Sequence, residues 1–215
     1  MTPEWVTAIA AGIGAFGIVF VAFQVKIAAD QLKQSQIELA ADHERSRREH
    51  AIGVIRRWTD SLDKTLPAAR AFAQELSKDN CKCLIRREPF EVSESYKHLL
   101  SHALKDVLEN ESELEVKNNK IQLNQKHLSH LLALIIQHLN SLEVALLSWM
   151  NGVADKDMIE SQFQYLVRFE DGHFFLENIR EVMAGKASFP AIDLFVDHLT
   201  KKYNEAQPKP KTKIA

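Results

Sequence analysis

The chain has 215 residues, of which 46% are hydrophobic, and its 27 basic and 29 acidic side chains give a net charge of -2. This hydrophobic content excludes a disordered chain, and the balanced charge gives no reason to expect nucleic acid as a partner. The chain has 7 Gly and 6 Pro, too few for the frequent turns of a many-stranded sheet. We therefore predict an all-α protein with long helices.

Residues 5–23 read WVTAIAAGIGAFGIVFVAF, a stretch of 19 residues without a charged side chain. As an α-helix this stretch is about 28 Å long, which matches the hydrocarbon core of a bilayer. No Lys or Arg precedes it, which argues against a secretory signal peptide, whereas Lys26 and Lys33 follow it. Because positive residues stay on the cytoplasmic side, we predict that residues 1–27 are a single transmembrane anchor, with the N-terminus outside and the rest of the chain in the cytoplasm.

Two pairs of small residues lie four positions apart within this anchor, Ala8 with Gly12 and Ala10 with Gly14. Such spacing lets two membrane helices approach closely, which predicts a homo-oligomer. The alternative is that Ala and Gly are simply frequent in membrane helices.

Residues 24–49 contain no Gly or Pro, so the helix is expected to continue out of the bilayer as a stalk over residues 28–50. Ala28, Leu32 and Leu39 follow the four- and seven-residue spacing of a short coiled coil. The spacing fades at residues 42–50, which are polar on all sides.

Residues 51–206 are expected to form an antiparallel, cytoplasmic helical bundle. Pro67 suits the first turn of a helix, so the stalk helix should end near Thr65. Residues 121–150 are densely apolar and should form the central helix, whose polar interruptions argue against a second membrane span. Gly152 should end this helix in a left-handed conformation.

The other boundaries follow from capping residues. Residues 81–92 are predicted to be a loop with a short strand at residues 83–85. Asp155 or Asp157 should begin a helix that reaches Phe169, and residues 188–190 (Ser-Phe-Pro) should begin the last helix. The basic tail, residues 207–215, is expected to be disordered.

Cys81, Cys83, His98 and His102 are candidate metal ligands, because two histidines four residues apart lie on one face of a helix. However, structural zinc sites usually separate their cysteines by two to four residues, and here a single residue lies between them. The alternative is four unrelated side chains, and we expect no metal.

Arg168 and His173 have the Arg-x4-His spacing that some helical ribonucleases use to steady a phosphate and transfer a proton. Arg45 and His50 repeat the same spacing, as expected by chance in a chain with nine histidines. Gly172 should also break a helix inside the first pair, so we predict no catalytic site.

Asn140 and Glu143 are polar positions in the predicted central helix. Buried polar groups need partners, and we expect Arg168 or Arg180 to pair with Glu143. These residues form either the wall of a binding site or a structural network that sets the register of the helices. No phosphate-binding loop, dinucleotide fingerprint or nucleophile elbow is found in the sequence, so no cofactor is expected.

The stretch LNSLEVALLSWMNGVADKDMIESQF begins at Leu139 and is followed by Ile179-Arg180 and Phe189-Pro190. In this stretch the chain resembles a bacterial family of unknown function. Its members combine one N-terminal transmembrane helix, a stalk helix and a cytoplasmic helical bundle. The matching positions are Asn140, Glu143, Gly152, Val153, Asp155 and Arg180. The resemblance implies the bacterial inner membrane as location, and some members of the family are suspected of a role in phage defence.

From these patterns we expect a membrane-anchored, non-enzymatic interaction or scaffold protein. It should self-associate through anchor and stalk, and its bundle should dock a cytoplasmic protein. The alternative is an oligomerising phage-defence effector that acts on the membrane or on RNA.

Overall fold

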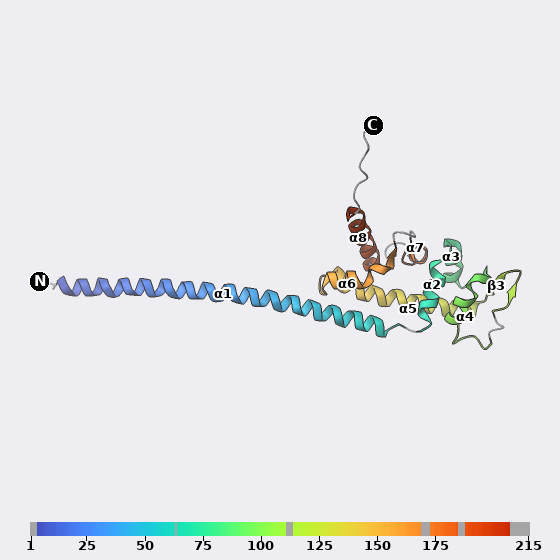
Figure 1. The fold of residues 1–215 in the computed structure, drawn as a ribbon, viewed down its shortest axis with the longest axis horizontal. Helices are drawn as coiled ribbons and strands as arrows, with labels where there is room; N and C mark the ends of the chain where they lie inside the picture. Colours follow the sequence, from blue (N-terminus) through green and yellow to red (C-terminus); the bar gives the residue numbers. More distant parts are fainter. Residues whose placement is uncertain (1–3, 63, 111–113, 169–172, 185–187, 207–215) are drawn as a thin grey trace, which may run out of the picture. The chain divides into compact units, whose positions relative to one another are not determined.

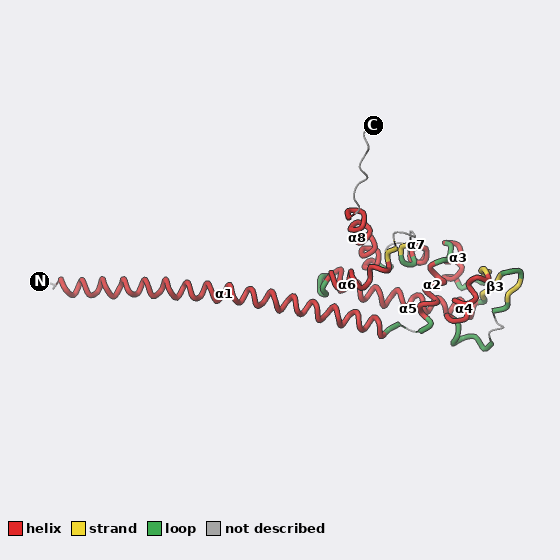
Figure 2. The backbone as a smooth tube through the Cα atoms, in the orientation of Figure 1, coloured by secondary structure: helices red, strands yellow, loops and turns green. Residues whose placement is uncertain are grey.

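The computed structural model describes the backbone of residues 4–62, 64–110, 114–168, 173–184 and 188–206 (Figure 1). For some of these residues only the backbone is described, namely 4–19, 22, 167–168, 173–174, 184 and 206. The chain divides into two compact units, Met1–Arg47 and Arg48–Ala215. Most of the described backbone is helical, which confirms the predicted fold class in its coarse form (Figure 2).

The first unit consists of the greater part of α1 (Glu4–Asp60), a helix of 57 residues. Figure 1 shows α1 as one uninterrupted helix. This continuity was predicted from the absence of Gly and Pro over residues 24–49, which leaves every backbone N–H available for the helix. In this unit, every described side chain from Phe20 to Arg47 is exposed.

In the second unit, the last turns of α1 join the bundle. Ala51, Val54 and Trp58 are buried in its core at spacings of three and four, so one face of the helix packs inward. Arg48 forms an ion pair of 3.7 Å with Asp155. The next helix, α2 (Leu66–Gln74), has its proline in the first turn, which confirms the prediction made from Pro67.

The prediction of a loop over residues 81–92 is wrong for the first half of this segment. It contains most of α3 (Lys78–Arg86), in which Ser77 accepts a hydrogen bond of 3.2 Å from the N–H of Asn80. Cys81 and Leu84, three residues apart, are both buried. The cap and this helical spacing stabilise a helix where the short apolar run had indicated a strand. Arg87 ends α3 in a left-handed conformation with φ 57°.

A small antiparallel sheet was not predicted. It has the order β1-β3-β2, with β1 (Phe90–Ser93), β2 (Val116–Lys117) and β3 (Lys120–Leu123). Asn118 and Asn119 have φ of 52° and 60°, the conformation that a two-residue hairpin turn requires. The central helix therefore begins after this sheet, at Gln125, and not at residue 121. Between β1 and β2 lie a 3-10 turn (Glu94–Tyr96) and α4 (Lys97–Ala103).

The central helix is α5 (Gln125–Met150), capped by Asn124, whose Oδ1 accepts from the N–H of His127 at 3.0 Å. It packs against α2, α3, α6 and α8. Among residues with described side chains, which leave out 1–19, α5 is the one helix long and apolar enough to cross a membrane. Half of that apolar stretch is buried inside the bundle, which is typical of a core helix.

The C-terminal elements follow the predicted caps. Gly152 has φ +66°, as predicted, and the Oδ1 of Asp155 accepts from the N–H of Met158 at 3.0 Å to begin α6 (Lys156–Phe163). The prediction that this helix reaches Phe169 is wrong, because a 3-10 turn (Gln164–Leu166) and the paired strands β4 (Val167–Arg168) and β5 (His173–Phe174) follow it. The last helices are α7 (Glu177–Ala184) and α8 (Pro190–Ala206), and residues 207–215 lie outside the described residues.

Candidate functional site

Glu143 of α5 caps the N-terminus of α8. Its Oε1 accepts from the N–H of Ala191 at 2.8 Å, and its Oε2 accepts from the N–H of Ile192 at 3.0 Å. The first N–H groups of a helix have no partner within the helix, and Pro190 has no N–H to offer. The carboxylate therefore satisfies two free donors and lies at the positive end of the helix dipole.

Arg180 of α7 contacts the same end of α8 by a different route. Its side chain is only 7% exposed, its Nε donates to the carbonyl of Phe175 at 2.8 Å, and its Nη1 donates to Asp193 in the first turn of α8. Burial lowers the pKa of Arg180, while the nearby carboxylates, Glu143 among them, act in the opposite direction. A buried guanidinium paired in this way fixes α7 against α8.

The predicted pairing of Glu143 with Arg180 needs correction, while the side chain of Arg168, the other predicted partner, lies outside the described residues. Glu143 accepts from two backbone N–H groups, whereas Arg180 donates to Asp193, so the two side chains share a helix end without a direct hydrogen bond. Asn140 is exposed on α5 and lies outside this network, because the inward face of the helix there is occupied by Leu139 and Leu142. Glu143 and Arg180 thus join α5 and α7 to the first turn of α8.

A pocket of about 190 Å³ opens beside Arg180, between α7 and α8. It is lined by Glu177, Arg180, Glu181, Asp193, Val196, Asp197 and Thr200. Four carboxylates against one guanidinium disfavour an anionic ligand such as a phosphate. Within the described part of the chain, no three His, Cys, Asp or Glu side chains are arranged to hold a metal ion.

A second polar cluster, centred on Glu160, joins α5, α6 and α8. Glu160 is 7% exposed, and its carboxylate accepts from the Nε1 of Trp149 at 3.1 Å and from the Nζ of Lys202 at 2.7 Å. The Nε2 of His198 lies 3.0 Å from the same carboxylate. Burial raises the pKa of Glu160, but the hydrogen bonds from Lys202 and Trp149 outweigh burial and hold this pKa below its usual value. Sequence reasoning missed this cluster, whose only local sign is an acidic residue next to the apolar Ile159.

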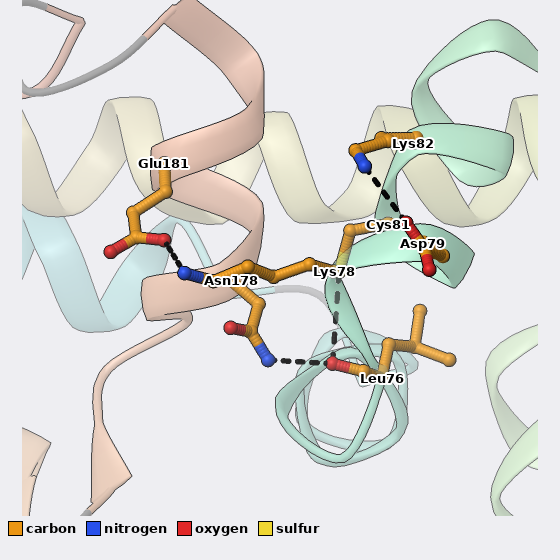
Figure 3. Close-up of polar contacts among 7 residues, drawn as sticks. All are labelled: Leu76, Lys78, Asp79, Cys81, Lys82, Asn178 and Glu181. Atoms are coloured by element: carbon orange, nitrogen blue, oxygen red, sulfur yellow. Dashed lines mark hydrogen bonds and ion pairs between the residues drawn. The ribbon is translucent and has the colours of Figure 1, made fainter.

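The four candidate metal ligands are not brought together. Cys81 is fully buried, its Sγ lies 3.8 Å from the carbonyl of Leu76, and burial raises the pKa of its thiol to about 11 (Figure 3). Figure 3 also shows Asn178 of α7 donating to the Leu76 carbonyl and Lys78 paired with Glu181. These contacts join α3 to α7, which is a structural role. His98 and His102 are exposed on α4.

The remaining candidates are described only in part. The backbones of Arg168 and His173 face each other across the β4–β5 pair, so the spacing lies on a hairpin and not on a helix. The side chains of Arg168 and His173 lie outside the described residues. Of Ala8, Ala10, Gly12 and Gly14 the structure describes only the backbone, which is part of α1.

His138 is a buried residue of α5 that packs between aromatic rings. Its ring centroid lies 6.3 Å from that of Trp58 and 5.3 Å from that of Phe175. Neither ring nitrogen of His138 has a hydrogen-bond partner within the described residues, and the Nε1 of Trp58 has none either. Burial, helped by the charge of Arg70, lowers the pKa of His138 to about 4, so the ring is neutral at pH 7.

Buried and half-buried charges thus hold the helices of the bundle together. Glu143, Arg180 and Glu160 each have partners on another helix or on the end of one. No family model, no curated protein and no solved structure matches this chain.

Proposed function

We propose that this protein is a membrane-anchored, non-enzymatic scaffold. Residues 1–27 hold it in the bacterial inner membrane, residues 28–50 form a stalk that associates with other copies, and the cytoplasmic bundle docks a protein partner. The observation that supports this proposal most is that the described side chains of α1 are exposed over residues 20–47, a segment that overlaps and follows a stretch of 19 uncharged residues.

Several large apolar side chains of α1 are exposed to solvent. Phe20 and Phe23 are each 61% exposed, and Val25 is 63% exposed. Leaving apolar surface in water costs about 25 cal/mol per Å², so a helix that exposes such residues continuously favours lipid or another protein around it. Phe20 and Phe23 belong to the uncharged stretch, for which lipid is the natural surrounding.

The arrangement of the bundle supports a binding role. Two of its ionic groups are engaged in helix packing: the half-buried Glu143 at the start of α8, and the buried Arg180 on Asp193. Because these groups join helices to one another, we place the docking of a partner on the outer faces of the bundle.

Two charges placed in the anchor should release the protein from the membrane. A lysine at the centre of a membrane helix costs about 2.5–3.5 kcal/mol on insertion scales, so Ile13→Lys together with Ile18→Lys should move most of the chain from the carbonate-washed membrane pellet to the soluble fraction. Ile37→Lys, a change of the same kind in the stalk, should leave the chain in the pellet. An unsubstituted chain in the soluble fraction would contradict the anchor.

Docking is tested by purifying the full-length protein in mild detergent, identifying co-purified proteins by mass spectrometry and measuring the particle mass. We expect at least two copies of the chain together with a stoichiometric second protein. Glu143→Ala is the control, because it disturbs the bundle and leaves the anchor and the stalk unchanged, so it should weaken binding of the second protein and keep the copies together. A strictly monomeric particle without a bound protein would contradict the scaffold.

A further inference from the structure

We propose that α1 pairs, parallel and in register, with α1 of a second copy of this chain through a heptad seam that runs from Ala11 to Leu39. The inference rests on the proposed membrane anchor and adds to it the residues and the geometry of self-association. The seam lies entirely within the first unit, Met1–Arg47.

The seam consists of two positions of a seven-residue repeat that continues unbroken from the uncharged stretch into the stalk. The first position is occupied by Ala11, Ile18, Val25, Leu32 and Leu39. The second position is occupied by Gly14, Val21, Ala28 and Ser35. All nine residues are uncharged, which is the pattern that two supercoiled helices need along their contact line. Because α1 has no break, one repeat can pass through both environments.

The stalk part of this face is uncovered in the single chain. Val25, Leu32 and Leu39 are 63%, 62% and 59% exposed. The charged residues of the same turns, Lys26, Asp30, Lys33 and Glu38, all occupy other positions of the repeat. The helix therefore has one uncharged line of positions from Ala11 to Leu39, and a second helix with the same spacing would cover it.

A second copy fits this face better than an unrelated protein does. Copies anchored through the same residues lie parallel, with equal residues at equal depth, which is the condition for a continuous in-register pair. At the flanking positions, Gln31 of one copy would face Gln36 of the other, and Glu38 would face His43. These flanking pairs bring no like charges together. Gly14, at the seam within the uncharged stretch, permits the close backbone approach that pairing in lipid requires.

The seam ends after Leu39. The next two seam positions hold Asp42 and Ser46, and two Asp42 carboxylates facing each other would repel. Nine residues beyond Asp42, α1 begins to pack into its own bundle at Ala51. The pairing segment and the bundle segment of α1 are thus consecutive, so self-association and bundle packing do not compete for the same residues.

Disulfide cross-linking of single-cysteine substitutions in isolated membranes tests this pairing. In the full chain, Leu32→Cys, Ser35→Cys and Leu39→Cys place a thiol on the seam, whereas Gln34→Cys, Ile37→Cys and Ala41→Cys place one off it. The seam variants should give about fivefold more cross-linked dimer on mild oxidation than the off-seam variants. The unsubstituted chain, which carries Cys81 and Cys83, measures the background.

Equal cross-linking at all six positions, or a maximum at Gln34 or Ile37, would overturn the proposed seam. A second measurement uses charge: Leu32→Asp with Leu39→Asp should reduce the dimer in detergent about tenfold, while Ile37→Asp, an equally exposed apolar residue off the seam, should not. The membrane fraction is measured on every sample. A chain that stays in the membrane without the seam pattern refutes the pairing alone, whereas a chain absent from the membrane refutes the anchor.

Discussion

Replacing Glu143 with Ala is expected to lower the free energy of unfolding of the bundle by about 3 kcal/mol. The carboxylate accepts from the N–H groups of Ala191 and Ile192, and the substitution leaves both donors without their acceptor at a partly buried helix end. It also removes a negative charge near Arg180. Urea unfolding of the detergent-solubilised protein, followed by tryptophan fluorescence, measures the effect.

Two matched variants separate the cap from a general effect of substitution in α5. Glu143→Gln keeps one acceptor oxygen and should lose about 1–2 kcal/mol. Asn140→Ala removes an exposed side chain of the same helix and should change stability by less than about 0.5 kcal/mol. If Glu143→Ala were no more destabilising than Asn140→Ala, the cap would not contribute to stability.

The bundle is also expected to lose about 3 kcal/mol of stability between pH 7 and pH 4 because of His138. Its pKa is about 4 in the folded protein, against 6.5 for the free side chain, since the buried ring packs on Trp58 and Phe175 near Arg70. Below pH 6.5 the unfolded chain binds a proton that the folded chain does not, so stability falls as the pH falls toward 4. Unfolding at a series of pH values measures the slope.

His138→Leu should remove this part of the pH dependence. The variant should be as stable as the parent at pH 7, or more stable, because two buried nitrogens without partners are removed. The exposed His102 on α4 offers the control, and His102→Leu should keep the slope of the parent. A parental slope in His138→Leu would show that other groups cause the acid sensitivity.

Several helix boundaries could be predicted because their signals lie within a few residues of the boundary. Pro67 marks the first turn of α2, Asp155 caps α6 through the N–H of Met158, and Gly152 has the positive φ that ends α5. The unbroken course of α1 follows in the same way from the absence of Gly and Pro over residues 24–49. Each of these features depends on local backbone sterics and hydrogen bonds, which are set by residue types within a few positions in the sequence.

The small sheet also has a local signal, although the prediction missed it. Residues 116–123 read VKNNKIQL, in which Asn118 and Asn119 suit a two-residue turn between alternating apolar and polar residues. The apolar Ile121 and Leu123 were instead assigned to the central helix, whose own apolar run begins shortly after them. Short apolar runs fit a strand and a helix equally well when they adjoin a long helix.

By itself, the sequence determined the long helix, the helical class of the body and some helix ends, such as those at Gly152 and Asp155, because these depend on contacts within one or two turns. Only the tertiary structure decided which partners the polar residues have. Glu143 accepts a hydrogen bond at the start of α8, and Arg180 pairs with Asp193. Glu160 accepts hydrogen bonds from Trp149 of α5 and Lys202 of α8. These partners come from other helices. A charged residue at a buried position needs a partner, but which residue becomes the partner depends on how the helices pack, and the sequence does not show this directly.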